Sequence, residues 1–319
     1  MTDGVALQVI DAVPLAHVLA IDVARRAGVR ALVVKGPSAS LHGLRPERLS
    51  ADADVLISPD GFEKYLAALG RSGWYERPTA EGPGPKALHS VTSIHDGWPC
   101  DIDAHVHFPG FLAPAQAVFD ELWSRREPLM LAGVELDTVD RAGAFLVAAL
   151  HALRTPAQTA RHEREMRGLV GRVIPSIDAA ARADVVALAI ATGAIDTARP
   201  VLARLDLPLP EPTPHGRDAA LDAWRARVGA RGETLAQWFP IVSRARWRDR
   251  PALVARMIWP TDASFRMSHP ETPPGRLAAD RGRWARVGRG LRAAPRVLRG
   301  RALAKRGVTD DSLLHGVPR

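Results

Sequence analysis

Cysteine is nearly absent from this sequence, which has only Cys100 among its 319 residues and so cannot form an internal disulfide. This usage fits a reducing compartment, and we expect a cytoplasmic protein. Aromatic residues make up only 5% of the chain, although eight of them are tryptophan. No apolar run is long enough to cross a bilayer, and the first residues lack the basic start of a signal peptide. We therefore expect no transmembrane segment.

Several common active-site motifs are also missing. The sequence has no Walker motif, no Gly-x-Gly-x-x-Gly turn and no Gly-x-Ser-x-Gly elbow. His162, Glu163 and Glu165 do not have the His-Glu-x-x-His spacing of a zinc peptidase helix, and Cys100 has no partner cysteines for a thiolate metal site. These absences argue against zinc-peptidase and thiolate-metal chemistry, and leave P-loop and dinucleotide-binding functions without support.

The rest of the composition is that of a globular protein. Apolar residues make up 46% of the chain, which is enough for a sizeable core without metals or disulfides. The length allows one large domain or two. The net charge is +8, and the arginines are concentrated near the end of the chain. This uneven distribution points toward an acidic partner.

The most informative stretch is VVKGPSASLHGLRPERLSADADVLIS, residues Val33–Ser58. It predicts an apolar strand, a glycine turn at Lys35-Gly36, a short helix and a second strand that starts with Asp52 and Asp54. Side chains two positions apart on a strand point the same way, so the two carboxylates should converge. Without a positive partner, the repulsion between the two carboxylates would raise the pKa of one of them and favour its protonated form. A divalent cation removes this conflict, and hard oxygen ligands suit Mg²⁺.

These features together resemble the nucleotidyltransferase superfamily typified by DNA polymerase beta, and within it a bacterial branch of free-standing nucleotidyltransferase-family proteins. The likeness rests on the Lys-Gly turn, on Arg48 four positions before Asp-x-Asp, and on the Val-Leu-Ile run that follows. The helix and turn at Gly61–Trp74 and the strand CDIDAHVHF at Cys100–Phe108 continue the pattern. The similarity covers roughly residues 15–110 of this chain.

The resemblance implies an enzyme that binds an NTP and two Mg²⁺ ions. Asp52 and Asp54 would hold both ions, and Asp103 would be the third, catalytic carboxylate, with Asp101 on the same strand face as the alternative. In such a reaction an acceptor hydroxyl attacks the α-phosphorus and pyrophosphate leaves. The alternative for the first two acids is an ordinary solvated start of a strand.

Five further residues would contact the nucleotide in a protein of this kind: Lys35, Gly36, Ser38, Arg48 and His105. The Lys-Gly turn would offer backbone N–H groups and a positive charge to phosphate. Pro37 has no N–H to give, so hydroxyls of Ser38 and Ser40 could replace it. His105 would orient Asp103 or touch the phosphates. The alternatives are that Lys35 is an ordinary surface lysine, that Arg48 is an exposed loop arginine and that His105 has only a structural role.

The pattern of elements predicts an α+β fold, with a small mixed-sheet nucleotidyltransferase core followed by a mainly helical region. We expect a catalytic domain at residues 1–137 and a helical domain at residues 138–319 that ends in an arginine-rich tail. Residues 87–95 and 101–108 should form a hairpin that turns at Asp96-Gly97.

The arginine-rich tail, residues 281–306, carries Trp284 and Leu291 among apolar residues at near-helical spacing. We expect this apolar stripe to pack on the protein, and we expect Pro295 and the glycines to interrupt any long helix. An anionic membrane surface and the phosphates of RNA are the functional alternatives for the tail.

The function that we expect is transfer of a nucleoside monophosphate from an NTP to a hydroxyl or phosphate of an unidentified acceptor, in a natural-product, peptide or glycan pathway. One alternative is an RNA-modifying toxin that acts on tRNA and holds it with the basic tail. The other is a non-catalytic binding protein that keeps the fold.

Overall fold

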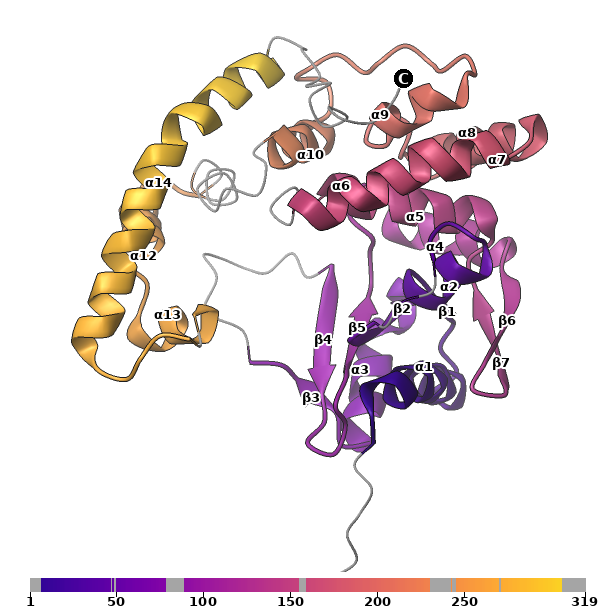
Figure 1. Ribbon diagram of the computed structural model, residues 1–319, viewed down its shortest axis with the longest axis horizontal. Coiled ribbons are helices and arrows are strands. Elements are labelled where there is room, and N and C mark those ends of the chain that lie inside the picture. Colours follow the sequence, from indigo (N-terminus) through magenta and orange to yellow (C-terminus); the bar gives the residue numbers. More distant parts are fainter. Residues whose placement is uncertain are drawn as a thin grey trace, which may run out of the picture.

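The computed structural model of the protein describes residues 7–46, 48, 50–78, 89–154, 159–229, 242, 245–269 and 271–305. A seven-stranded mixed sheet forms its centre, helices lie on both faces of the sheet, and a series of helices follows (Figure 1). This arrangement confirms the α+β class expected from the sequence. Within the described part of the chain, no helix is both long enough and apolar enough to cross a membrane.

The sheet combines parallel and antiparallel pairs of strands. Its strands are β1 (Ala31–Val33), β2 (Asp52–Ile57), β3 (Tyr75–Glu76), β4 (Ser90–Ile94), β5 (Asp101–His105), β6 (Glu127–Leu131) and β7 (Val134–Thr138), in the spatial order β3-β4-β5-β2-β1-β7-β6. β2 runs parallel to β5 and antiparallel to β1, and β1 runs parallel to β7. The hairpin β4–β5 turns at Asp96-Gly97 as predicted.

Helices precede, interrupt and follow the strands. Those around the sheet are α1 (Val9–Arg26), α2 (Gly36–Leu41), α3 (Phe62–Arg71), α4 (Ala115–Ser124) and α5 (Arg141–Arg154), with a 3-10 turn at Pro59–Gly61. The later ones are α6 (Thr159–Gly168), the π-helical turn η3 (Leu169–Val173), α7 (Ile174–Ser176), α8 (Ala179–Ala191), α9 (Arg199–Leu202) with η4 (Ala203–Leu205), α10 (Ala219–Gly229), α12 (Arg250–Ile258), α13 (Asp262–Ser268) and α14 (Arg276–Lys305). The sequence also predicts a helix over residues 234–242, of which only residue 242 is among the described residues.

Two hydrophobic cores cover the two faces of the sheet. Alternate residues of a strand point to opposite faces, so Leu32 joins one core while Val33 joins the other. The first core continues into α4, α5, α6 and α8, and the second is formed with α1 and α3. Both faces of β2 are covered by these cores, and its last three residues, Val55, Leu56 and Ile57, are accordingly all apolar.

The helical region shares its core with the sheet. Buried residues of α5 belong to the same hydrophobic cluster as Leu32 and Leu56 of the sheet and Val185 of α8. The last strand ends at Thr138, whose hydroxyl donates a hydrogen bond to the carbonyl of Val33 at 2.8 Å. The division into domains at residues 137 and 138 stays a prediction.

The arginine-rich tail differs from the sequence-based expectation in two ways. α14 is one continuous helix that includes Pro295, so the expected interruption by proline and glycine is wrong. Gly282 is needed for packing, because a Cβ there would lie 2.5 Å from the ring of Phe265 on α13. The expected packing of the apolar stripe is also wrong at two of its positions, since Trp284 is 64% exposed and Leu291 is 71% exposed.

Candidate active site

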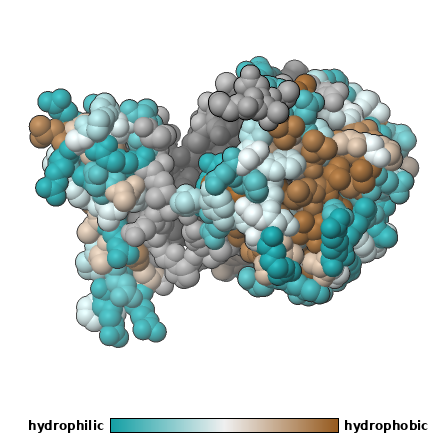
Figure 2. Space-filling model, turned by 90° about the horizontal axis from the view of Figure 1, so that it is seen from below, coloured by the Kyte–Doolittle hydropathy of each residue, from teal (hydrophilic) through white to brown (hydrophobic). Residues whose placement is uncertain are grey.

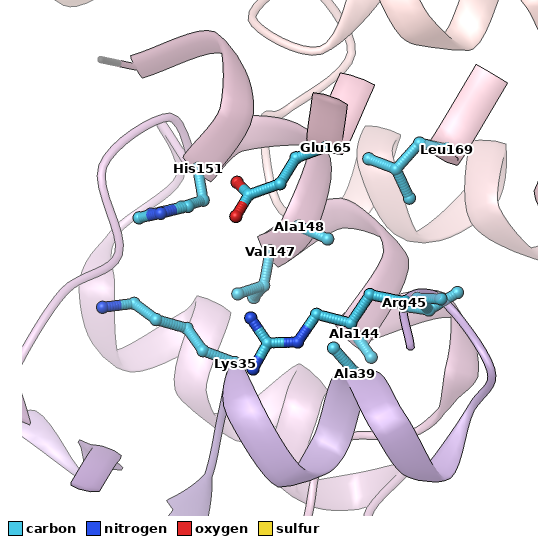
Figure 3. Close-up of a pocket in the computed structure, with 10 residues that line it drawn as sticks. Lys35, Ala39, Arg45, Ala144, Val147, Ala148, His151, Glu165 and Leu169 are labelled. Carbon is cyan, nitrogen blue, oxygen red and sulfur yellow. The ribbon is translucent and has the colours of Figure 1, made fainter. Parts of the chain in front are cut away.

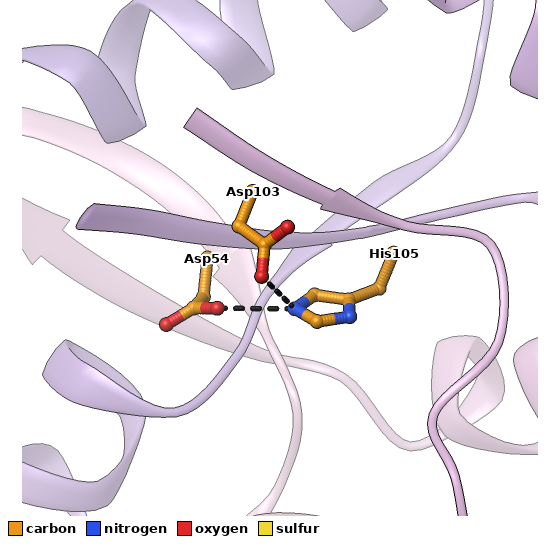
Figure 4. A group of neighbouring side chains, drawn as sticks. All are labelled: Asp54, Asp103 and His105. Atoms are coloured by element: carbon orange, nitrogen blue, oxygen red, sulfur yellow. Dashed lines mark hydrogen bonds and ion pairs between the residues drawn. The ribbon is translucent and has the colours of Figure 1, made fainter. Parts of the chain in front are cut away.

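The parallel pairing of β2 and β5 brings two aspartates together. Asp54 lies directly opposite Asp103 in the register of these strands. Directly paired residues point to the same face of a sheet, and His105 follows Asp103 by two positions, so its ring points to that face too. The three side chains therefore meet although the two strands are far apart in the sequence (Figure 4).

The histidine ring bridges the two carboxylates. His105 Nε2 lies 3.0 Å from Asp54 Oδ1 and 3.2 Å from Asp103 Oδ2. One ligand atom from each of the three residues lies within 4.8 Å of the others. Two carboxylate oxygens and an imidazole nitrogen are a donor set that divalent cations accept, with Mg²⁺ preferring the oxygens and Mn²⁺ tolerating the nitrogen. Chemically, this group fits a metal site.

Lys35 supplies the positive charge of the group in this structure. Its ammonium contacts Asp54 Oδ1 and lies 3.1 Å from His105 Nε2 and 3.9 Å from Asp103 Oδ2. Lys35 sits in the turn between β1 and α2 with φ 58° and ψ −117°, a conformation that is rare for residues with a Cβ. Such backbone strain costs about 1–3 kcal/mol and occurs most often at functional sites.

Both carboxyl groups are held in their ionised form. Burial acts to raise the pKa of Asp54, but the charge of Lys35 and the hydrogen bond from His105 outweigh it and keep the pKa below its usual value. Burial likewise acts to raise the pKa of Asp103, and contacts with His105, Lys35 and Thr92 again lower it overall. The site therefore carries two anionic carboxylates at neutral pH, which is the state that binds a cation.

The other two acids of these strands have separate partners. Asp52 lies opposite Asp101 at the start of the parallel pair, and its carboxylate accepts a hydrogen bond of 2.8 Å from Ser50. Asp101 forms an ion pair with Arg77. Neither belongs to the three-residue group described above. Of the two alternatives for the third carboxylate, Asp103 is the one that the fold places beside Asp54.

The predicted nucleotide contacts are spread over a wider area. Gly36 and Ser38 are buried in the first turn of α2, and the Ser38 hydroxyl has no hydrogen-bond partner among the described residues. Arg48 does not reach the acids of β2. It forms an ion pair of 2.8 Å with Glu165 of α6 instead. Of the residues expected to bind phosphate, the structure brings Lys35 and His105 to the carboxylates.

A cavity of about 50 Å³ lies among α2, α5 and α6, and Lys35, which contacts Asp54, is part of its lining. Lys35 and Arg45 line one side of it, and His151 and Glu165 face them from the other (Figure 3). The rest of the lining is apolar and consists of Ala39, Leu44, Ala144, Val147, Ala148 and Leu169. A Cβ at Gly36 would lie 3.3 Å from Arg45 Nη2, so a glycine there leaves room for the guanidinium.

Thr92 and, apart from Lys35, the residues that line the cavity were not predicted from the sequence as part of the site. The Thr92 hydroxyl donates a hydrogen bond of 3.2 Å to Asp103 Oδ1, because the two residues are directly paired in the hairpin β4–β5. The predicted hairpin contained a signal for this contact, since its register determines which residue faces Asp103. The cavity had no comparable signal, because its lining comes from elements that meet only in the folded chain.

Comparisons with known proteins give only distant similarities. No protein-family model matches the chain, and no curated protein matches it. One similar solved structure is an antigenic nucleotidyltransferase-like protein from Paracoccidioides brasiliensis, with 13% identity, a TM-score of 0.35, and coverage of 59% of this chain and 92% of that one. Another is a tRNA nucleotidyltransferase complexed with a primer tRNA and an incoming ATP analogue, with 11% identity, a TM-score of 0.25, and coverage of 91% and 96%. Similarity at this level assigns neither a function nor individual residues.

Proposed function

We propose that this protein is a Mg²⁺-dependent nucleotidyltransferase that moves a nucleoside monophosphate from an NTP to a hydroxyl or phosphate of an acceptor. The observation that carries the proposal is the pairing of Asp54 with Asp103 across parallel strands, with His105 and Lys35 in contact with both acids. Two ionised carboxylates on rigid strands, beside a lysine and a mainly apolar cavity, suit a metal-bound polyphosphate better than they suit an uncharged substrate.

The carboxylates would hold the metal ions. Asp54 and Asp103 would bind one Mg²⁺ ion, and Asp52, two positions before Asp54 on the same strand, would join Asp54 at a second. The bound ions would neutralise phosphate charge and lower the pKa of the attacking hydroxyl. His105 would orient both acids through Nε2, and Thr92 would hold the other oxygen of Asp103.

Lys35 would change its partner when the substrate binds. In this structure its ammonium neutralises Asp54, a task that a metal ion would take over. The released ammonium would then be free to contact the triphosphate, next to the buried hydroxyl of Ser38. The mainly apolar cavity, with Arg45 and His151 in its lining, has a volume of about 50 Å³ and would accept only a small part of the nucleotide. In the reaction, the bond between the acceptor oxygen and the α-phosphorus forms, the bond to the β-phosphate oxygen breaks, pyrophosphate leaves, and the acceptor proton passes to water.

The test is incorporation of label from each of the four α-³²P-NTPs, with Mg²⁺, into total RNA, small peptides or sugars, together with release of pyrophosphate. We expect transfer by the wild-type protein and loss of transfer in Asp54→Asn. Asp22→Asn, on the exposed side of α1, is the matched control and should retain activity. A cytoplasmic location, where NTPs and Mg²⁺ are abundant, is part of the same proposal.

The outcomes separate the candidate functions. Transfer of label to RNA would identify an RNA-modifying enzyme. Transfer of label to a peptide or sugar would identify an enzyme that acts on small acceptors. The protein could instead bind NTP and Mg²⁺ equally well as wild type and as Asp54→Asn, and transfer no label to any acceptor. This result would identify a binding protein and contradict the enzymatic proposal.

A further inference from the structure

The outward face of α14 carries a row of exposed apolar side chains. Leu277, Trp284 and Leu291 follow one another at intervals of seven residues and are 77%, 64% and 71% exposed. A spacing of seven places side chains on the same side of a helix. Trp259, at the end of α12, extends the row, since its ring meets that of Trp284 edge-on with centroids 5.4 Å apart. We call these four residues the apolar row.

Positive charge surrounds the apolar row. Residues 276–305 contain nine arginines and one lysine but only one acidic residue, Asp280. Arg281, Arg289 and Arg292 are exposed. Arg281 stands four positions after Leu277 and three before Trp284, so it is a surface neighbour of both. The face therefore combines large apolar side chains with exposed guanidinium groups at its border.

The opposite face of α14 fixes the helix to the protein. Arg283 is buried, forms an ion pair of 2.6 Å with Asp280 and lies 3.4 Å from Asp262. Gly282 packs against Phe265, and Arg286 donates a hydrogen bond to the carbonyl of Met257. Of the apolar row, Trp284 and Trp259 contact each other between α14 and α12, whereas Leu277 and Leu291 stand clear of these contacts. The exposure of the two leucines therefore needs another explanation.

We propose that the apolar row and its arginines bind the surface of an anionic lipid bilayer. Leucine side chains gain free energy only when an apolar medium takes them out of water, whereas arginine gains from anions, and a bilayer with acidic headgroups offers both at once. Tryptophan is well suited to the boundary between the two. Figure 2 shows the body that contains α14, at the left, as mainly hydrophilic with scattered hydrophobic residues, as expected for binding that depends on charge as well as insertion.

Two other occupants fit the face less well. RNA would satisfy the arginines and could stack bases on tryptophan, but it offers nothing to Leu277 and Leu291. A second copy of this chain would bring two arginine-rich helices together, and like charges would oppose that contact. The bilayer accounts for both features of the face.

Flotation of the full-length protein with vesicles tests the proposal. We expect the protein to float with vesicles of phosphatidylcholine and phosphatidylglycerol in a ratio of about 3:1 at low salt, and to remain behind with pure phosphatidylcholine. Salt should weaken the binding. Replacing both exposed leucines, Leu277→Gln with Leu291→Gln, should lower the partition coefficient about tenfold or more. Met130→Gln, at a position 63% exposed on the edge strand β6, is the matched control and should bind like the wild type.

Because all three substituted side chains are exposed, thermal unfolding should show that each variant keeps the wild-type fold. Failure of the wild-type protein to float with the anionic vesicles at low salt would overturn the proposal. So would anionic binding that the leucine substitutions leave unchanged. If the protein also bound RNA in a gel-shift assay, and Arg281→Gln with Arg292→Gln removed that binding while the leucine variant retained it, the face would be a polyanion site instead.

Discussion

Asp54 on β2 and Asp103 on β5 lie directly opposite each other, and one imidazole nitrogen of His105 contacts both. Pairing in parallel strands holds the two acids on rigid backbone, so their separation does not depend on a loop. A metal site on such a frame is pre-organised, and loss of one ligand cannot be compensated by movement of the backbone. Substitution of either acid should therefore have a large effect on any reaction that needs the metal.

Substitutions of Asp103 and Asp101, both on β5, test which of the two is the third metal ligand. Asp103→Asn should lower nucleotidyl transfer by about a hundredfold or more, because it removes a metal ligand. Asp101→Asn should retain most of the activity, because Asp101 pairs with Arg77 rather than with Asp54. Initial rates at saturating NTP and Mg²⁺ measure the difference. The reverse ranking of the two variants would transfer the role to Asp101.

Lys35 should compete with divalent cations for the carboxylates. Its ammonium contacts Asp54, so Lys35→Met should tighten binding of Mn²⁺, by about tenfold if the lysine opposes the metal by about 1.4 kcal/mol. The same variant should bind NTP more weakly, since a phosphate contact is lost. Electron paramagnetic resonance measures free Mn²⁺, and Lys64→Met, on the exposed side of α3, is the control. Unchanged or weaker Mn²⁺ affinity in Lys35→Met would contradict competition.

The cavity beside α2 should contribute to nucleotide affinity by accepting a small part of the nucleotide. Ala148 is one of its apolar lining residues, so Ala148→Phe should fill the space and raise the KM for NTP several-fold with a smaller effect on kcat. Ala180→Phe, at an exposed position in the first turn of α8, controls for the added ring. Equal kinetics for the two variants would show that no part of the nucleotide occupies the cavity.

Acid should destabilise the protein through the paired carboxylates. The folded-state pKa values of Asp54 and Asp103 lie below the ordinary value of 3.8, so their contribution to stability is fully present above about pH 4 and is lost as the pH falls toward those lower values. Asp103→Asn should be less stable than the wild type at pH 7, and the two should converge as the pH falls toward 2. Urea unfolding followed by tryptophan fluorescence measures both curves. A difference in stability that grew with acidity would have the wrong sign for depressed pKa values.

Two glycines of α14 should respond to alanine in opposite ways. Gly282→Ala places a methyl group 2.5 Å from the buried ring of Phe265 and should destabilise the protein by about 1–3 kcal/mol through overpacking. A methyl group at Gly288 would meet no neighbouring side chain within 4 Å, so Gly288→Ala should stabilise the helix by up to about 1 kcal/mol. Chemical denaturation gives both values, and stabilisation by Gly282→Ala would show that α13 and α14 do not pack closely in solution.

Much of the local structure follows from the sequence. Apolar runs bounded by glycine and proline marked β1 and β2, and the alternation in residues 101–105 marked β5. The spacing on a strand predicted that Asp52 and Asp54 share a face, and the resemblance to known nucleotidyltransferases added Asp103 and His105 to the expected site. Residues two apart on a strand share a face whatever the strand pairs with, so the common face of Asp103 and His105 could be inferred locally, but the meeting of Asp54 with Asp103 could not.

Only the tertiary structure decided which side chains became partners. Asp52 and Asp54 have the same local pattern, yet Asp54 contacts Lys35 and His105, whereas Asp52 accepts a hydrogen bond from Ser50. The register of the strands selects these contacts. Arg48 pairs with Glu165 on a helix that begins more than a hundred residues later. The spacing of Trp284 and Leu291 indicated a buried stripe, but burial depends on which face of α14 meets its neighbours, and Phe265 meets Gly282 on the other side. Periodicity determines that a helix has an apolar face, and only the packing of the whole chain determines whether that face is covered.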